Sequence, residues 1–422
     1  MVTNSFSKEE VVAFEKLLQG FQDALVLSEH VTVFTTDQVM MERAGDTIWR
    51  PQPFIAVSYD GPDMTNNFNS QTQLSVPASI GYWKTSPWPL TVKEMRDPLQ
   101  AERLRKSAEE KLASDINYAI LSTLANQGTI VVTKSSAAAD FGDVANIEGA
   151  LNRLGVQGWE REVAFTTGTY NLLAKDLANR QNMVDMTKEA YRRGYVGMVA
   201  NFDTWKLDYS IRCAAATGGA GLTMDTRSTA SNYWVPKAIR VASTGEKSNV
   251  DNRYQQVTIS STTNVAAGDC FTIAGIYEAH HIRKSSTGSL KTFRVISVDS
   301  STLLTISPPI ISNQGGSMAE QQYQNCVVTT SASAAIVFLN TQAADINPFW
   351  QKGAIELLPG RLPVPTDAGV GVLRSTTEEG IELCLQKWYD INTTQLKYRV
   401  DCLFGVSVVQ PEMCGIALYG QS

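Results

Sequence analysis

Residues 97–128 carry helical character without a break. Asp97 followed by Pro98 is a favoured helix start, with a capping side chain and then proline at the first helical position, and Gly128 is a favoured end. The apolar residues between them recur at helical spacing: Leu104, Ala108, Leu112, Ile116, Ile120 and Leu124. About thirty residues at roughly 1.5 Å each make a rod of about 45 Å. We therefore expect one long helix that serves as a structural spine.

Two segments before this helix are predicted to contact other parts. Ser7 and Glu10 fit a capping box, and the apolar residues that follow predict an amphipathic helix, which either folds back on its own domain or docks on a neighbour. Residues 31–89 combine strand signals with a polar tip, which predicts a long hairpin-like excursion. Two strands bury too little surface to be stable alone in water, so we expect another subunit to cover the excursion.

The chain after the spine changes character twice. Helices predicted at 143–154 and 170–178, with a buried strand at 163–165, indicate an α/β domain. A stretch of small residues at 214–221 marks a boundary, and the short β-runs of residues 222–345 predict a small β-barrel. Near the end, apolar and polar residues alternate over 396–408, which predicts one strand of about 43 Å.

Length and composition exclude several classes of protein. At roughly 100–200 residues per domain, 422 residues predict two to four units. Lys and Arg number 36 against 42 for Asp and Glu, and the net charge of −6 argues against a dedicated nucleic-acid binder. The six cysteines form no C-x-x-C pair, so we expect reduced, partly buried thiols. No signal peptide or membrane-spanning run is recognisable, so we expect folding in a cytoplasm and no membrane partner.

Motifs for catalysis or metal binding are not found. Glu278 and His281 are the only acidic match to a Glu-x-x-His spacing, but they lie among β-runs, and we interpret His280 and His281 as a loop dipeptide. Phosphate-binding loops and the nucleophile elbow are missing. We predict no catalytic, cofactor-binding or metal-binding residues, no cofactor and no enzyme activity. Six tryptophans are candidate interface anchors, although core packing is the favoured reading for each: Trp83, Trp88, Trp205, Trp234, Trp350 and Trp388.

Five short motifs occur in order along the chain. They are Thr47-Ile48-Trp49 with Pro51; Glu189-Ala190-Tyr191-Arg192 with Gly194 and Phe202-Asp203; Val250-Asp251-Asn252-Arg253 followed by Gly268-Asp269; Phe349-Trp350 with Ala354-Ile355; and Pro411-Glu412 with Gly415 and Gly420-Gln421. With the order of the predicted parts, they make the chain resemble a tailed-phage major capsid protein of the Hong Kong 97 fold. The inserted barrel makes it most similar to coat proteins of the Salmonella phage P-twenty-two type.

This resemblance implies an α+β fold with an A-domain, a P-domain that holds the spine helix, an E-loop, an N-terminal arm and an inserted β-barrel. The implied divisions are an N-terminal arm at 1–34, the extended loop with flanking P-domain strands at 35–95, the spine helix at 96–128, the A-domain at 129–221 and 346–392, the insertion domain at 222–345, and the closing P-domain strand with the C-terminus at 393–422.

The resemblance also implies function and contacts. Hexamers and pentamers of the chain would form an icosahedral shell around packaged double-stranded DNA, bound without sequence specificity, with a scaffolding protein and a portal protein as partners; the mature location would be the virion. Implied contacts between capsomers are Glu246, Lys247, Asp251 and Arg253 in one loop of the barrel, with the loop 280–284 as a second candidate. Implied contacts of the extended loop with a neighbouring subunit are Arg50, Asp60, Asp63 and Lys84.

Three alternatives remain open. The β-rich barrel and the aromatic residues also suit a surface or tail-associated carbohydrate-binding protein. A hydrolase could assemble its site from carboxylates distant in sequence. A cellular encapsulating compartment would share the fold but hold a cargo enzyme in place of DNA.

Overall fold

The computed structural model describes most of the chain and divides it into two compact units. The described residues are 6–34, 47–52, 58, 60–65, 68, 74–91, 94, 98–179, 197–207, 209–218, 221–224, 251–312, 322–329, 333–362 and 371–422. The first unit comprises Met1–Ile48, Ala78–Thr123 and Ile355–Ser407. The second comprises Trp49–Pro77, Leu124–Ala354 and Val408–Ser422. The architecture is the predicted α+β class.

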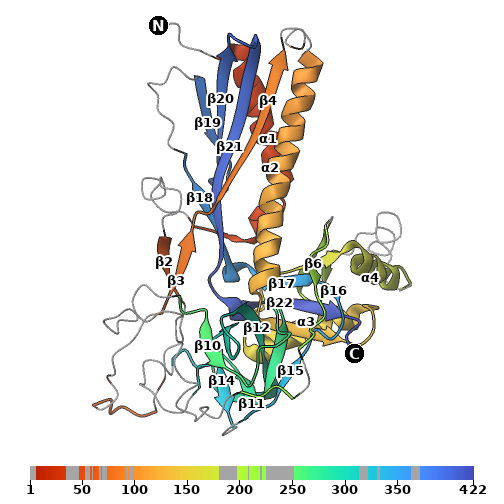
Figure 1. The fold of residues 1–422 in the computed structure, drawn as a ribbon, viewed down its shortest axis with the longest axis vertical. Helices are drawn as coiled ribbons and strands as arrows, with labels where there is room; N and C mark the ends of the chain where they lie inside the picture. Colours follow the sequence, from red (N-terminus) through yellow and green to blue (C-terminus); the bar gives the residue numbers. More distant parts are fainter. Residues whose placement is uncertain are drawn as a thin grey trace. The chain divides into compact units, whose positions relative to one another are not determined.

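The first unit is built on a six-stranded sheet in which β21 is central (Figure 1). On one side β21 pairs with β20, which pairs with β19; on the other it pairs with β4 and with β18, which pairs with β1. The strands are β1 (Thr32–Val33), β4 (Tyr82–Thr91), β18 (Ile355–Gly360), β19 (Gly371–Thr376), β20 (Glu382–Asp390) and β21 (Gln395–Val408). The long strand predicted from the alternation of residues 396–408 is therefore confirmed.

Helix α1 (Lys8–Ala24) folds back on the first unit. The capping box is present: Ser7 Oγ accepts from the Glu10 amide at 3.2 Å, and Glu10 Oε2 accepts from the Ser7 amide at 2.8 Å. Phe14, Leu17 and Phe21 are buried. Because the apolar stripe is covered within its own chain, the first of the two sequence alternatives for this helix is correct.

Helix α2 (Pro98–Gln127) is the predicted spine. It ends where expected, because Gly128 donates its amide to the Leu124 carbonyl at 2.8 Å. A Cβ at position 128 would lie 2.9 Å from that oxygen and 3.1 Å from Gly415 Cα, so the close backbone approach requires glycine.

The second unit contains an α/β part and a barrel. The α/β sheet has the order β5-β22-β17-β6-β8-β7, with parallel pairs β5–β22 and β6–β8. Its core includes Phe165, Phe202 and Phe349, packed against two helices. The elements are β5 (Ile130–Lys134), α3 (Phe141–Leu154), β6 (Arg161–Thr166), α4 (Thr167–Asn179), β7 (Met198–Val199), β8 (Phe202–Leu207), β17 (Asn347–Gln351) and β22 (Cys414–Tyr419). The predicted helices and buried strand are confirmed.

The barrel is a six-stranded antiparallel sheet of order β10-β13-β12-β11-β14, with β15 also paired to β11 (Figure 1). Residues 222–224 close it, because Thr223 bridges to Ala335 beside β15 and Met224 bridges to Ile259 beyond β10. Its strands are β10 (Gln255–Thr258), β11 (Cys270–Ala279), β12 (Ser286–Val298), β13 (Leu303–Ser307), β14 (Cys326–Val328) and β15 (Ile336–Phe338). Stacked rings of Phe271 and Phe293, with centroids 5.7 Å apart, lie in its core.

Short elements complete the chain. The predicted excursion contains the pair β2 (Thr47–Pro51) and β3 (Ser75–Ser79), and much of its tip lies outside the described residues. The pair β9 (Arg212–Cys213) and β16 (Ala344–Asp345) lies in the second unit, and the 3₁₀ turns are η1 (Ser28–His30), η5 (Lys352–Ala354) and η7 (Pro411–Met413). All six cysteines are free and buried.

The two units divide the end of the chain differently from the domains implied by the resemblance. β20 pairs with β21 in the first unit, whereas β22 lies in the α/β sheet of the second. Alternation predicts that a segment is a strand but does not identify the sheet it joins. The domain divisions implied by the resemblance all stay predictions.

Candidate functional site at the base of the barrel

The barrel is joined to the α/β part by buried charged side chains that lie between them. Arg294 on β12 is 1% exposed, and its Nη1 donates to the carbonyl of Ala125 and, at 3.4 Å, to that of Gly128. Its Nη2 donates to the Gly268 carbonyl at 3.3 Å. The last carbonyls of a helix have no partner within the helix, so Arg294 satisfies groups that the end of α2 leaves open.

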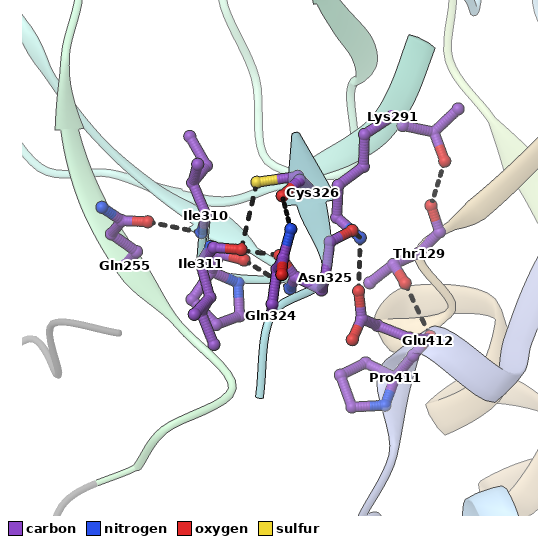
Figure 2. A network of polar contacts seen from close by, with 12 residues as sticks. Thr129, Gln255, Lys291, Ile310, Ile311, Gln324, Asn325, Cys326, Pro411 and Glu412 are labelled. Atoms are coloured by element: carbon purple, nitrogen blue, oxygen red, sulfur yellow. Dashed lines mark hydrogen bonds and ion pairs between the residues drawn. The ribbon is translucent and has the colours of Figure 1, made fainter. Parts of the chain in front are cut away.

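A second contact is an ion pair between β12 and η7. Lys291 Nζ donates to Glu412 Oε1 and, at 3.1 Å, to the Asn325 carbonyl; the two charged side chains are 6% and 15% exposed. Figure 2 shows the Lys291 ammonium facing the Glu412 carboxylate beside Thr129 and Pro411. Thr129 Oγ1 donates to the Pro411 carbonyl at 2.6 Å, so neutral hydrogen bonds surround the ion pair.

The pKa of Glu412 is lowered by its surroundings. Burial is the largest effect and by itself would raise it, but the positive charge of Lys291 and the neighbouring His281 and Lys284 outweigh burial. The carboxylate is therefore held in its ionised form, which keeps the ion pair intact at neutral pH.

The loop 280–284, predicted as a possible contact with partners, packs against α3 of its own chain. The His281 amide donates to the Leu154 carbonyl at 2.8 Å. The His280 ring lies against Gly155, so close that a Cβ at position 155 would be 2.4 Å from the ring's Cε1 atom. His280 Nδ1 accepts from the amides of Ile282 and Arg283 at 3.2 and 3.3 Å, which fits the loop interpretation.

Glu278 and His281 do not converge as metal ligands. Glu278 accepts from Arg153 Nε at 3.3 Å and from Thr287 Oγ1 at 2.9 Å. His281 Nε2 is buried without a hydrogen-bond partner, and burial lowers the pKa of this histidine. Within the described part of the chain, no group of three or more His, Cys, Asp or Glu side chains is placed to hold a metal ion.

The barrel-loop residues implied as contacts between capsomers are only partly described. Glu246 and Lys247 lie outside the described residues. Arg253 is 8% exposed and makes a bidentate pair with Asp251, with Nε–Oδ1 at 3.0 Å and Nη2–Oδ2 at 2.7 Å. Its Nη1 also donates to the Val408 carbonyl at 2.9 Å. The structure brings this pair together within one chain, and its role between capsomers stays a prediction.

The extended-loop candidates do not form one cluster. Arg50 lies on β2 and is partly exposed. Asp60 and Asp63 are exposed, and Asp63 Oδ1 accepts from the Thr65 amide at 3.1 Å and from Thr65 Oγ1 at 2.5 Å. Lys84 lies on β4 opposite Cys402 of β21. Their contacts with a neighbour also stay predictions.

A polar cluster on the sheet of the first unit was not predicted from the sequence. Asp401 on β21 is fully buried and accepts four hydrogen bonds, from Thr85 Oγ1 at 2.5 Å, Arg399 Nε at 2.8 Å, Gln386 Nε2 at 3.1 Å and Trp83 Nε1 at 3.3 Å. The Arg399 guanidinium lies over the Trp83 ring, 5.7 Å from its centroid. One pattern in the sequence could have indicated this cluster: polar residues occupy alternate positions in the strand 396–408, and Arg399 and Asp401 are among these polar positions.

The tryptophans divide between core and surface. Trp88 and Trp350 are buried, as the favoured reading predicted, and Trp205 is partly buried. Trp83 and Trp388 are 54% and 49% exposed, which leaves them as candidate anchors, and Trp234 lies outside the described residues. Among the described helices, none is both long and apolar enough to cross a membrane.

Comparisons with known proteins identify the family. The family model described as P22 coat protein, gene protein 5, matches residues 1–420. Solved structures similar to the chain include one from Mycobacterium phage Che8, with 10% identity, a TM-score of 0.44 and coverage of 93% of this chain and 90% of that chain. The acidic stable capsid of Helicobacter pylori bacteriophage KHP30 matches with 10% identity, a TM-score of 0.43 and coverage of 93% and 88%.

A third similar structure is the CUS-3 coat protein I-domain, which is 34% identical, with a TM-score of 0.22 and coverage of 29% of this chain and 98% of that chain. The family match spans almost every residue that the sequence provides. The chain therefore belongs to the P22 coat protein family and is a phage major capsid protein.

Proposed function

We propose that hexamers and pentamers of this chain close into an icosahedral shell around packaged double-stranded DNA. The observation that carries the proposal is the family match over residues 1–420, because a capsid protein assembles with copies of itself and its place is the virion. The net charge of −6 supports a container for DNA, since each phosphate neutralised by a fixed cation would hold the genome to the wall.

The proposed partners are a scaffolding protein that guides a precursor shell in the host cytoplasm and a portal protein at one vertex. In a closed lattice each further contact is effectively intramolecular, so modest contacts between chains add up to a stable shell. Weak individual contacts also let a misplaced subunit leave before the shell closes. The proposal needs no catalytic step, and we propose a purely structural role.

The proposed contact residues are those implied by the resemblance, with Trp83 added from the structure. Trp83 presents a half-exposed ring with Arg399 stacked on it, and large aromatic side chains of this kind contribute most to binding at interfaces. The exposed carboxylates of Asp60 and Asp63 are available for charge pairs with a neighbour.

The test is co-expression of the chain with its helper protein, followed by sedimentation and negative-stain imaging. We expect closed shells of uniform diameter, and a Trp83→Ala variant that folds as a monomer but yields fewer shells. Trp83→Phe keeps an aromatic ring and is expected to assemble. A folded chain that stays monomeric at every concentration, salt and helper ratio would refute the proposal, and shells filled with a host enzyme in place of DNA would support the compartment alternative.

A further inference from the structure

Two of the six cysteines are in contact at the base of the barrel. Cys213 is the last residue of β9, which pairs with β16 next to the α/β sheet, and Cys270 is the first residue of β11 in the barrel. Their sulfur atoms approach the same carbonyl oxygen, that of Gly268, at 4.0 and 3.6 Å, and both residues belong to one buried cluster. Cys213 Sγ also donates to the Ala214 carbonyl at 3.5 Å. The residues are 5% and 0% exposed. The fold therefore places a thiol pair at the point where the barrel joins the rest of the second unit.

The surroundings of this pair hold one buried cation, Arg294, and one buried carboxylate, Asp269. The buried guanidinium of Arg294 donates to the same Gly268 carbonyl at 3.3 Å. Its Nε has no hydrogen-bond partner. The nearby Asp269 already accepts from the Ala266 amide at 2.8 Å and from Asn340 Nδ2 at 2.9 Å. The positive charge of Arg294 would favour the ionised form of a thiol beside it.

The two thiols have different acidities. The hydrogen bond from Cys270 lowers the pKa of Cys213, with help from the charge of Arg294 and against burial. The same hydrogen bond and burial raise the pKa of Cys270. Cys213 is thus the more acidic thiol of the pair, and Cys270 the less acidic one. Burial raises the pKa of each of the other four cysteines, including Cys326 and Cys414 to about 12.

We propose that Cys213 and Cys270 form a redox site that hydrogen peroxide converts to a disulfide, fastening the barrel to the α/β part. The Cys213 thiolate attacks one peroxide oxygen and breaks the O–O bond, which gives a sulfenic acid and releases hydroxide. The Cys270 sulfur then attacks the Cys213 sulfur and breaks its S–O bond, and the thiol proton leaves with the hydroxyl as water. In total two thiols lose two electrons and two protons, and one peroxide becomes two waters.

The consequence concerns the barrel's attachment. β9 pairs with β16, which leads directly into the α/β sheet, whereas β11 is the barrel strand that pairs with β12, β14 and β15. A disulfide between the two strands would add a covalent link to the non-covalent contacts that Arg294 and Lys291 already make at the base of the barrel. We expect amide hydrogen exchange at the start of β11 to slow after oxidation, because local opening there would require the linked strand to move as well.

The experiment treats the native full-length chain with hydrogen peroxide at neutral pH, removes the peroxide with catalase, and then unfolds and alkylates the protein. We expect the number of alkylated cysteines to fall from six to four, with a single cross-linked peptide pair that contains Cys213 and Cys270. The Cys213→Ser variant should keep all five remaining thiols. The Cys270→Ser variant should instead accumulate a sulfenic acid at Cys213 that dimedone traps.

A Cys326→Ser variant is the matched control, since Cys326 is a buried barrel cysteine outside the pair, and it should lose two thiols as the wild type does. Mapping of the wild-type protein needs no variant, so the test stands even where a serine substitution impairs folding. Six intact thiols after treatment of the folded protein, or oxidation spread over all six, would overturn the proposal.

Discussion

Replacing Lys291 by methionine removes the positive charge from the ion pair at the base of the barrel and leaves the Glu412 carboxylate buried without it. The two side chains are 6% and 15% exposed, so water replaces little of the lost interaction. Breaking a buried pair by removing one partner costs about 3–5 kcal/mol. Because Lys284 remains near Glu412 and offsets part of this loss, we expect about 3 kcal/mol.

The assay is native-state hydrogen exchange of the β11 and β12 amides, which measures the free energy of local opening without requiring the whole chain to unfold in one step. The matched control replaces both charges, Lys291→Met with Glu412→Leu, and should recover most of the lost stability because no unpaired charge remains buried. If the single and the double variant open equally easily, the loss comes from packing and the electrostatic reasoning is wrong.

The same ion pair predicts a pH dependence. Since the pKa of Glu412 is lowered in the folded chain, its contribution is fully present above the ordinary glutamate value of 4.5 and is lost as the pH falls through the lowered value. The difference in stability between the wild type and Lys291→Met should therefore shrink under acid conditions. A difference that stays constant down to the pH of unfolding would contradict the assignment of the stabilising charge to Glu412.

Further expectations concern single side chains. Burial lowers the pKa of His281, so protonation of the unfolded chain should reduce the unfolding free energy as the pH falls below the ordinary value of 6.5, and thermal unfolding of His281→Phe should lack this part of the pH dependence. Gly405→Ala should lower the free energy of unfolding in urea by about 1–3 kcal/mol, because the added Cβ would lie 2.3 Å from the Ser79 carbonyl oxygen. Gly149→Ala in α3 is the control: its Cβ meets nothing within 4 Å, so it should raise the same free energy by about 0.5–1 kcal/mol. Asp401→Ala removes an acceptor shared by four donors and should cost about 1–3 kcal/mol, measured by tryptophan fluorescence during unfolding.

The helices and strands that were predicted correctly are those whose signals lie in neighbouring residues, such as a helix cap or an alternating pattern. The capping box of Ser7 and Glu10, the Asp97-Pro98 helix start and the alternation of residues 396–408 each correspond to an element with nearly the predicted bounds. The sequence could not predict that the N-terminal helix packs on its own unit, because the residues that contact it are distant along the chain. One example is Lys387, whose Nζ donates to Glu10 at 2.7 Å.

The charged base of the barrel was missed for a related reason. Arg294 lies between Phe293 and Val295, which point into the barrel core, so its position on the strand indicates an outward side chain. An outward charged residue is ordinarily solvated. Only the tertiary structure shows that the end of α2 covers this face of the barrel and that the outward positions 291 and 294 are buried.

The charged residues proposed for contacts between chains differ in how much of their hydrogen-bonding capacity is already used. Arg253 is buried and donates to Asp251 and Val408, so moving it to a neighbouring chain would first break charge-assisted bonds in a site from which water is excluded. Asp60 is exposed, and pairing it with a neighbour's cation requires no such loss. Exposed pairs of this kind are worth only about 0–1 kcal/mol each. A shell held by many of them can still be stable, because the lattice makes each later contact intramolecular, while every single contact stays weak enough to reverse during assembly.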